Sequence, residues 1–326
     1  MPKIFVSRAL PHSAIQMLYD AFGEESVSIF SEDRVIHRDE LLESVKGIDA
    51  LLPILTETID AELLDAAGPQ LKIVANYAVG YNNIDVPAAT ERKIPITNTP
   101  GVLTETTADL AWSLMLATSR RLGEGERYLR AGKWKAWAPQ LLLGDDIHGS
   151  TLGIFGLGRI GQAVARRAKG FNMRVIYNDA APADAAIEKE LGVSFVDKPT
   201  LLAESDILTI HCPLMDETRH AFSTDEFKAM KSSAILVNTA RGPVVDEAAL
   251  AKALQAGDIN AAGLDVFEEE PTIHPELLKC ENALIIPHLG SATKDTRAKM
   301  AEIAATNIIA RLNGETPPNC VNPEVL

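Results

Sequence analysis

Residues Thr151 to Asp179 read TLGIFGLGRIGQAVARRAKGFNMRVIYND, and they carry the strongest structural pattern in the chain. The segment opens with an apolar run, Leu152 to Phe155, which predicts a buried strand. Three glycines follow at the spacing G-x-G-x-x-G, and a helical pattern then leads to a second apolar run, Met173 to Tyr177. This order predicts a strand, a tight turn, a helix and a second strand.

Each glycine of the turn has its own predicted use. Gly156 lets the chain turn sharply, Gly158 lets a pyrophosphate approach the backbone, and Gly161 lets the helix pack close to the strand. The N-terminus of the helix offers phosphates its free N–H groups and the positive end of its dipole. We therefore predict that the turn binds a dinucleotide in a domain of the Rossmann type.

The acid at the end of the second strand predicts which dinucleotide is bound. Asp179 lies eighteen positions after Gly161, where a carboxylate can accept hydrogen bonds from both hydroxyls of an adenosine ribose. No Arg or Lys stands at positions 180–183 to bind a 2′-phosphate. The pattern favours NAD over NADP, while the alternative for Asp179 alone is a turn or cap residue.

Length and composition exclude several classes of protein. The 326 residues indicate about two domains, each able to bury its own core. A net charge of -14 without a Lys/Arg block makes nucleic acid and anionic membranes poor partners. The three cysteines, Cys212, Cys280 and Cys320, are too far apart to indicate a disulfide framework or a metal site. Because neither a signal peptide nor a membrane-spanning run is indicated, we expect a cytoplasmic protein.

Short apolar runs alternate with helical patterns on both sides of the opening segment. Before it we expect strands at 3–6, 27–30, 48–52, 71–75 and 94–98, and helices at 11–21, 39–45 and 60–66. After it we expect strands at 193–196, 207–212, 234–238, 261–264 and 283–286, and helices at 183–191, 225–230, 246–256 and 293–312. This alternation is typical of parallel sheets and predicts two doubly wound α/β domains.

Loops that follow strand ends are the expected ligand-binding loops of such sheets. In the first domain these are 53–56 and 79–83. A long helical pattern begins near Thr104, and the loop after it contains Trp134 and Trp137. Their aromatic side chains indicate an interface, a lid, or simple packing beneath the loop.

Three polar residues stand at the ends of late strands, on the edge where the dinucleotide is expected. Arg241 can hold a carboxylate in a bidentate grip, and His288 can exchange a proton with a carbonyl or alcohol oxygen near neutral pH. Glu270 can orient that histidine and stabilise its charged form. Taken singly, the three could be a surface ion pair, an acidic turn and a structural histidine. Together they predict hydride transfer at a 2-oxo or 2-hydroxy acid.

Four segments and a tail resemble, in order and spacing, the D-isomer-specific 2-hydroxyacid dehydrogenase family. They are GLGRIG, NTARGPVVDE, AGLDVFEEEP and PHLGSAT, with the tail NCVNPEV. The resemblance covers essentially the whole chain. It implies a discontinuous, flavodoxin-like substrate domain at 1–100 and 289–326, and a Rossmann NAD-binding domain at 101–288.

The resemblance also implies roles for single residues. Arg241 would bind the substrate carboxylate, His288 would donate the proton in ketone reduction, and Glu270 would keep His288 protonated. The implied cofactor-binding residues are Gly156, Gly158, Arg159, Ile160, Gly161, Asp179, Cys212, Pro213, Thr239, Ala240, Arg241, Asp265, His288 and Gly290. Among these, Asp265 would bind the nicotinamide carboxamide. No metal is implied.

The implied substrate-binding residues are Leu55, Val79, Gly80, Arg241 and His288. Val79 and Gly80 would present backbone N–H groups to the substrate carboxylate. Leu55 would close the pocket.

Within the family, LLPILT, NYAVGYNNID and WKAWAP are most similar to glyoxylate and hydroxypyruvate reductases. Trp137 resembles a tryptophan that a dimer arm places over the neighbouring subunit's active site, so a homodimer is expected. Several of these reductases use NADPH and carry Asn or Ser followed by Arg where this chain has Asp179-Ala180. An NAD-linked enzyme could equally oxidise a D-2-hydroxy acid.

Other activities stay open at this point. A D-3-phosphoglycerate dehydrogenase or a D-lactate dehydrogenase is the alternative within the enzyme class. The resemblance extends to NAD-sensing corepressor-like binding proteins, which keep the same Arg, Glu and His set. Formate dehydrogenase agrees less well, because that branch uses a different partner for its histidine where this chain has Glu270.

Overall fold

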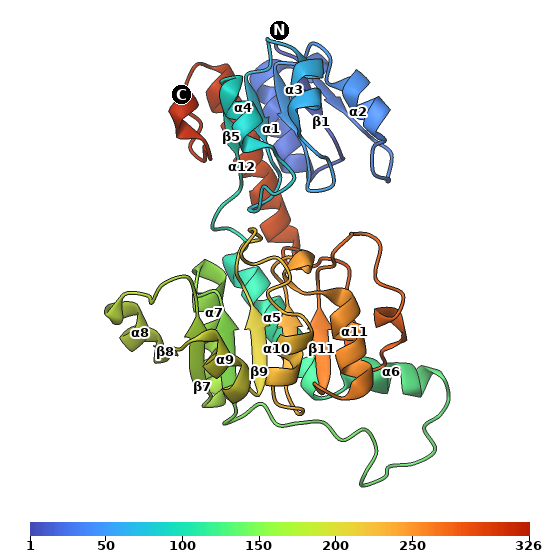
Figure 1. The fold of residues 1–326 in the computed structure, drawn as a ribbon. Coiled ribbons are helices and arrows are strands. Elements are labelled where there is room, and N and C mark those ends of the chain that lie inside the picture. Colours follow the sequence, from blue (N-terminus) through green and yellow to red (C-terminus); the bar gives the residue numbers. More distant parts are fainter. The chain divides into compact units, whose positions relative to one another are not determined.

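The computed structural model describes residues 1–326, which fold into two compact units. Unit 1 consists of Met1–Leu103 and Ala292–Leu326, and unit 2 consists of Thr104–Ser291. Each unit is built on one parallel sheet with helices on both faces (Figure 1). The predicted fold class, two doubly wound α/β domains, is confirmed.

The sheet of unit 1 has the strand order β2-β1-β3-β4-β5, which is the flavodoxin-like order. Its strands are β1 (Ile4–Val6), β2 (Val27–Ile29), β3 (Ala50–Leu52), β4 (Ile73–Ala75) and β5 (Ile96–Thr97). Its helices are α1 (His12–Phe22), α2 (Arg38–Ser44), α3 (Ala61–Ala67), α4 (Val86–Glu91) and α12 (Lys294–Leu312). Buried residues of α1 and α12 pack on one face of the sheet, and those of α2, α3 and α4 pack on the other. The central strands β1, β3 and β4 are buried throughout, as parallel strands covered on both faces are.

The C-terminal segment is part of this first sheet unit. After α12, the side chain of Asn322 accepts a hydrogen bond from Ile96 N at 2.8 Å and donates one to Ile94 O at 3.0 Å. Cys320 forms an antiparallel bridge with Thr97. The end of the chain therefore borders β5.

The sheet of unit 2 has the strand order β12-β11-β10-β9-β6-β7-β8. Its strands are β6 (Thr151–Phe155), β7 (Arg174–Asn178), β8 (Val193–Phe195), β9 (Ile207–Ile210), β10 (Ile235–Asn238), β11 (Ala261–Leu264) and β12 (Ala283–Ile285). β6 pairs with β7 on one side and with β9 on the other, so the strand order reverses at β6. In open α/β sheets, ligands bind beyond the carboxyl ends of the strands at such a switch point.

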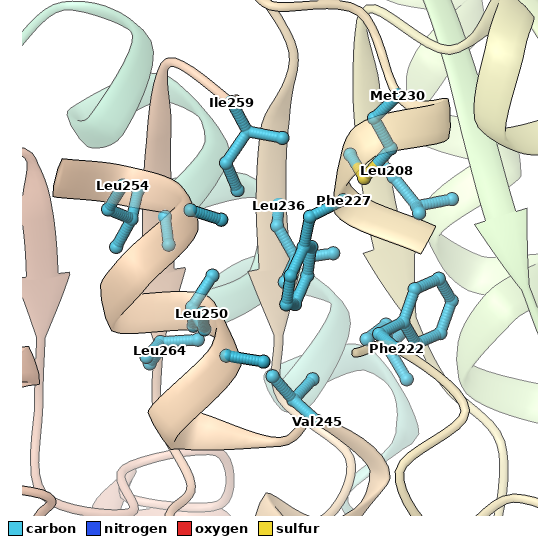
Figure 2. Packing of buried hydrophobic residues seen from close by; sticks show 14 of the residues in the cluster. Leu208, Phe222, Phe227, Met230, Leu236, Val245, Leu250, Leu254, Ile259 and Leu264 are labelled. Carbon is cyan, nitrogen blue, oxygen red and sulfur yellow. The ribbon is translucent and has the colours of Figure 1, made fainter. Parts of the chain in front are cut away.

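Helices cover both faces of this second sheet. They are α5 (Thr104–Ser119), α6 (Leu122–Arg130), α7 (Arg159–Ala168), α8 (Ala185–Leu191), α9 (Lys198–Glu204), α10 (Thr224–Ala229) and α11 (Glu247–Ala256). α5 and α7 share one buried cluster with the strands, and α9, α10 and α11 share the other. Figure 2 shows part of the second cluster, with Phe227 of α10 and Leu250 of α11 packed over Leu236 of β10. None of the helices combines the length and the apolar composition that a membrane span requires.

The sequence analysis missed three helices for identifiable reasons. α4 and α9 have only 6 and 7 residues, and each has a proline within its first two positions, where proline fits the first turn of a helix. Asp85 and Asp197 cap these two helices by accepting backbone N–H bonds. α6 contains Gly123 and Gly125 and buries no residue, so its apolar pattern is weak.

Candidate active site

The turn between β6 and α7 needs a glycine at two positions for steric reasons. Gly156 has φ +97°, and a Cβ on it would lie 2.6 Å from the backbone N of Cys212. A Cβ on Gly161 would lie 2.2 Å from the carbonyl oxygen of Gly156. Gly158 is different, because it is exposed and a Cβ there would meet nothing within 4 Å. The backbone at the N-terminus of α7 is therefore open to a phosphate group.

Asp179 follows β7 and lies directly beside this turn. Its Oδ2 accepts a hydrogen bond from Leu157 N at 2.7 Å, and its Oδ1 accepts one from Ala180 N at 2.7 Å. The side chain is exposed, and each carboxylate oxygen has a second lone pair for a ribose hydroxyl. The sequence-predicted turn and acid are thus brought together.

The residues that follow β9 and β10 line the same edge of the sheet. Burial raises the pKa of the Cys212 thiol to about 12, so this cysteine is protonated at neutral pH. The hydroxyl of Thr239 is buried and has no hydrogen-bond partner in the protein. Because buried polar groups are nearly always paired, this hydroxyl marks a place for a polar ligand atom. Together with the open backbone at Gly158, it fits a bound dinucleotide.

Arg241 is held in the loop that follows β10. The side chain of Asn238 accepts a bond from Ala240 N at 3.0 Å and donates one to Arg241 O at 2.9 Å, which fixes the loop backbone. The Arg241 side chain is partly buried. Burial lowers the pKa of its guanidinium and the charge of Glu270 opposes this effect, so the arginine stays charged.

The loop that carries Arg241 also touches the loop that carries Glu270. A Cβ on Gly242 would lie 1.8 Å from the carbonyl carbon of Phe267, so the two backbones approach as closely as a glycine permits. Phe267 N in turn donates a bond to Glu270 Oε1 at 3.0 Å. This close packing fixes Arg241 and Glu270 relative to each other.

His288 and Glu270 are joined by a hydrogen bond between their side chains. His288 Nδ1 lies 2.7 Å from Glu270 Oε2, and the two side chains are 34% and 35% exposed. Burial would raise the pKa of Glu270, but the bonds from His288 and Phe267 N together lower it, so Glu270 is a carboxylate at neutral pH. With Nδ1 turned toward the carboxylate, Nε2 is the ring atom that can pass a proton to a ligand.

Asp265 supports the backbone around His288. It is fully buried at the end of β11, and its carboxylate accepts bonds from Leu289 N and from Gly290 N, the latter at 2.8 Å. His288 N donates to Asp265 O at 2.9 Å, while His288 itself has the left-handed φ of +50°. Burial raises the pKa of Asp265. In the structure this residue holds the histidine loop, a role that the resemblance to the family did not imply.

Sequence reasoning also missed a second pair of acids behind Glu270. Glu247 N donates to Glu268 Oε1 at 2.7 Å, and Glu268 N donates in return to Glu247 Oε1. Glu247 is 5% exposed, and its other oxygen accepts a bond from His274 N at 3.0 Å. This reciprocal clamp joins the start of α11 to the loop that carries Glu270. The sequence contains no signal for it beyond the acids themselves.

The remaining candidates belong to unit 1. Leu55 follows β3 and is 36% exposed, while Val79 and Gly80 follow β4 and are partly buried. The two loops are joined by Asn83, whose Nδ2 donates to Ile54 O at 3.2 Å. Every other predicted site residue belongs to unit 2.

Comparisons with known proteins agree with this chemistry. The family profile for the D-isomer specific 2-hydroxyacid dehydrogenase, NAD binding domain, matches residues 112–290. The glyoxylate reductase of Thermococcus onnurineus is 52% identical over 329 residues, which cover 100% of this chain and 97% of that protein.

Two solved structures are similar over nearly their whole length. A Thermus thermophilus protein has a TM-score of 0.90 at 44% identity, covering 98% of this chain and 99% of its own. The NADPH-dependent glyoxylate/hydroxypyruvate reductase of Sinorhizobium meliloti has a TM-score of 0.82 at 33% identity, covering 99% and 98%. The chain therefore belongs to the D-isomer specific 2-hydroxyacid dehydrogenase family and is an oxidoreductase that acts on the CH–OH group.

Proposed function

We propose that this protein reduces glyoxylate or hydroxypyruvate to the D-hydroxy acid with NADH as the reductant. The observation that carries the proposal is the pair formed by His288 and Glu270, 2.7 Å apart, in the unit that also holds the dinucleotide turn. Arg241 is held close to that pair by the contact between Gly242 and Phe267. The names of the similar reductases support the choice of substrate.

The chemistry divides between a bound cofactor and the side chains. The nicotinamide, when bound, supplies the hydride that reduces the substrate carbonyl carbon. Arg241 holds the substrate carboxylate with two parallel N–H bonds and fixes the orientation of the neighbouring carbonyl. His288 gives its Nε2 proton to the carbonyl oxygen, and the negative charge of Glu270 stabilises the imidazolium before this transfer. Oxidation of the alcohol uses the same residues with the proton moving back to His288.

The preference for NADH over NADPH rests on Asp179. The exposed carboxylate beside the turn can accept the ribose hydroxyls, whereas a 2′-phosphate at the same place would face a like charge. The residues that follow are Ala180, Ala181, Pro182 and Ala183, and none of them is a cation.

We assign the substrate-binding domain to unit 1 and the NAD-binding domain to unit 2. The sequence boundaries proposed for them are 1–100 with 289–326, and 101–288. In unit 1, Leu55 would contact the substrate, and the N–H groups of Val79 and Gly80 would meet its carboxylate. The predicted cytoplasmic location stays a prediction.

We also propose that the protein is a homodimer. α6 buries none of its residues, and the segment 131–140 that follows it is exposed at every position. Trp134 is 53% exposed and Trp137 is 80% exposed, which is unusual for tryptophan. A second copy of the chain would bury this exposed apolar surface, and the exposure therefore supports the proposal.

The first test is steady-state kinetics with NADH and NADPH against glyoxylate, hydroxypyruvate, pyruvate and phosphohydroxypyruvate. We expect turnover of glyoxylate or hydroxypyruvate, with NADH preferred by about tenfold or more in kcat/KM because a ribose hydroxyl bond is lost and a like charge is added. In Asp179→Ser this preference should shrink. Turnover of pyruvate or phosphohydroxypyruvate alone would assign the alternative dehydrogenases, and tight NADH binding without any turnover would indicate a cofactor-sensing binding protein.

A second prediction concerns Glu270→Gln, which keeps the shape of the side chain and removes its charge. Because the bonds that lower the pKa of Glu270 keep it charged at neutral pH, the substitution removes the group that favours protonated His288. Reduction needs that proton. As the pH rises, the rate should therefore begin to fall at a pH about one unit or more below that of the wild type. The measurement is kcat/KM for glyoxylate from about pH 5 to about pH 9.

The neighbouring Glu269→Gln is the matched control, because Glu269 is exposed. It should keep the wild-type pH profile. An unchanged profile in Glu270→Gln would contradict the role given to Glu270.

A further inference from the structure

Three consecutive carbonyl groups in the loop after β4 accept hydrogen bonds from other residues of unit 1. Ala78 O accepts a bond from Thr99 N at 2.9 Å, and Val79 O accepts one from Asn98 Nδ2 at 2.8 Å. Gly80 O accepts a bond from Asn76 Nδ2 at 3.0 Å. Two of the three donors are side-chain amides, so the direction of these peptide groups depends on Asn98 and Asn76.

The direction of a carbonyl fixes the direction of the N–H group that follows it. In a trans peptide the C=O and the N–H point to opposite sides of the chain. Because Ala78 O and Val79 O point toward residues 98–99, the N–H groups of Val79 and Gly80 point away from that segment. Because Gly80 O points toward Asn76, the N–H of Tyr81 points away from Asn76. Asn76 itself is buried, with 1% of its surface exposed. The N–H groups of Val79 and Gly80 therefore point to the same side of the loop, and successive N–H groups on one side are a recurring way to bind an anion.

The amides are themselves held in place. Asn76 and Asn83 bond to each other at 3.3 Å, and Asn83 Nδ2 also donates to Glu57 O at 3.1 Å. Glu57 is 3% exposed, and its Oε2 accepts bonds from Ser7 Oγ at 2.6 Å and Ile54 N at 2.7 Å. This network connects the ends of β1, β3 and β4, so both predicted substrate loops rest on one polar cluster.

We propose that Asn98 is a positioning residue that aims the N–H of Gly80 at the carboxylate of the substrate, with Asn76 acting in the same way on Tyr81. The proposal rests on the proposed function in taking a 2-oxo acid as the anion.

The test begins with Asn98→Ala and Asn98→Asp. Asn98→Ala removes the side-chain donor to Val79 O. Asn98→Asp places a carboxylate there instead, and this carboxylate repels the carbonyl of Val79 and attracts the N–H of Gly80. We expect the KM for glyoxylate to rise by about tenfold in Asn98→Ala and by more in Asn98→Asp, because a charge-assisted bond to the carboxylate is weakened. The value of kcat and the Kd for NADH should stay near those of the wild type.

The controls are Asn313→Ala and Asn313→Asp, which make the same chemical changes at an exposed position in unit 1. They should leave KM unchanged. A merely structural role for Asn98 would lower Tm and the active fraction of the enzyme without a selective rise in KM, and that result would overturn the proposal.

A second measurement separates this proposal from the proposed function. Oxalate is added to the full-length protein, and the amide resonances of Val79, Gly80 and Tyr81 are followed by NMR. The Gly80 resonance should move in the wild type and in the Asn313 variants, and it should move far less in Asn98→Asp. If the wild type turns over no 2-oxo acid but shows this pattern, the positioning role stands and the proposed function fails. If oxalate does not move Gly80 in the wild type, or moves it equally in Asn98→Asp, the positioning role is wrong.

Discussion

His288→Ala is expected to lower kcat for glyoxylate reduction by about a hundredfold to ten-thousandfold at neutral pH, which is the range that a positioned general acid contributes. The hydrogen bond between His288 Nδ1 and Glu270 Oε2, at 2.7 Å, orients the ring and directs Nε2 to its ligand. Alanine leaves only water to protonate the carbonyl oxygen. The remaining rate should vary much less between pH 6 and pH 8, and steady-state rates of NADH oxidation at saturating glyoxylate give both results.

His12→Ala is the matched control for this substitution, because His12 is an exposed histidine at the start of α1. It should keep the wild-type kcat. NADH binding, followed by fluorescence, should remain in both variants, since the dinucleotide turn and Asp179 are untouched. If His288→Ala reduced glyoxylate at close to the wild-type rate, another group would have to supply the proton and the assignment of His288 would be wrong.

The fold could be predicted from the sequence because its strongest signals are local. The segment from Thr151 to Asp179 contains a complete strand, turn, helix and strand. Its periodicity can be recognised without knowing which other segments it packs against. α4 and α9 are harder to recognise because they have only 6 and 7 residues, which is too short for a clear period, and each begins with a proline in a first turn capped by an aspartate. The C-terminal tail was missed as a partner of β5 because Asn322 and Ile96 are 226 residues apart.

Some features of the site could likewise be predicted from local sequence, whereas others depend on contacts between distant segments. The strand ends that carry Arg241, Glu270 and His288 could be located from the sequence, and the family resemblance supplied their roles. The clamp between Glu247 and Glu268 could not be found, because two acids 21 residues apart resemble any solvated pair. The role of Asn98 could not be predicted either, because its contact with Val79 depends on the pairing of β4 with β5.

Arg241 is where the packing around the site has its clearest functional consequence. The glycine that follows it lies against Phe267, and Asn238 ties the backbone of the loop on both sides of the arginine side chain. The guanidinium itself donates to Ala240 O at 2.6 Å, so it is held beside this fixed backbone. A planar fork held in this way can match a carboxylate, whereas a single ammonium on a flexible stem cannot match it in the same geometry.

Arg241→Lys, which keeps the charge, is therefore expected to lower kcat/KM for glyoxylate by about a hundredfold. Arg241→Leu should lower it further, because removal of one partner of a desolvated charge pair weakens binding strongly. Much of the loss should appear as a higher KM, while the Kd for NADH changes little. Arg174→Lys and Arg174→Leu are the controls, since Arg174 begins β7 at the amino end of that strand and pairs with Glu204 at 2.7 Å. A kcat/KM in Arg241→Lys within about threefold of the wild type would show that charge alone is sufficient, and that the bidentate grip assigned to Arg241 is wrong.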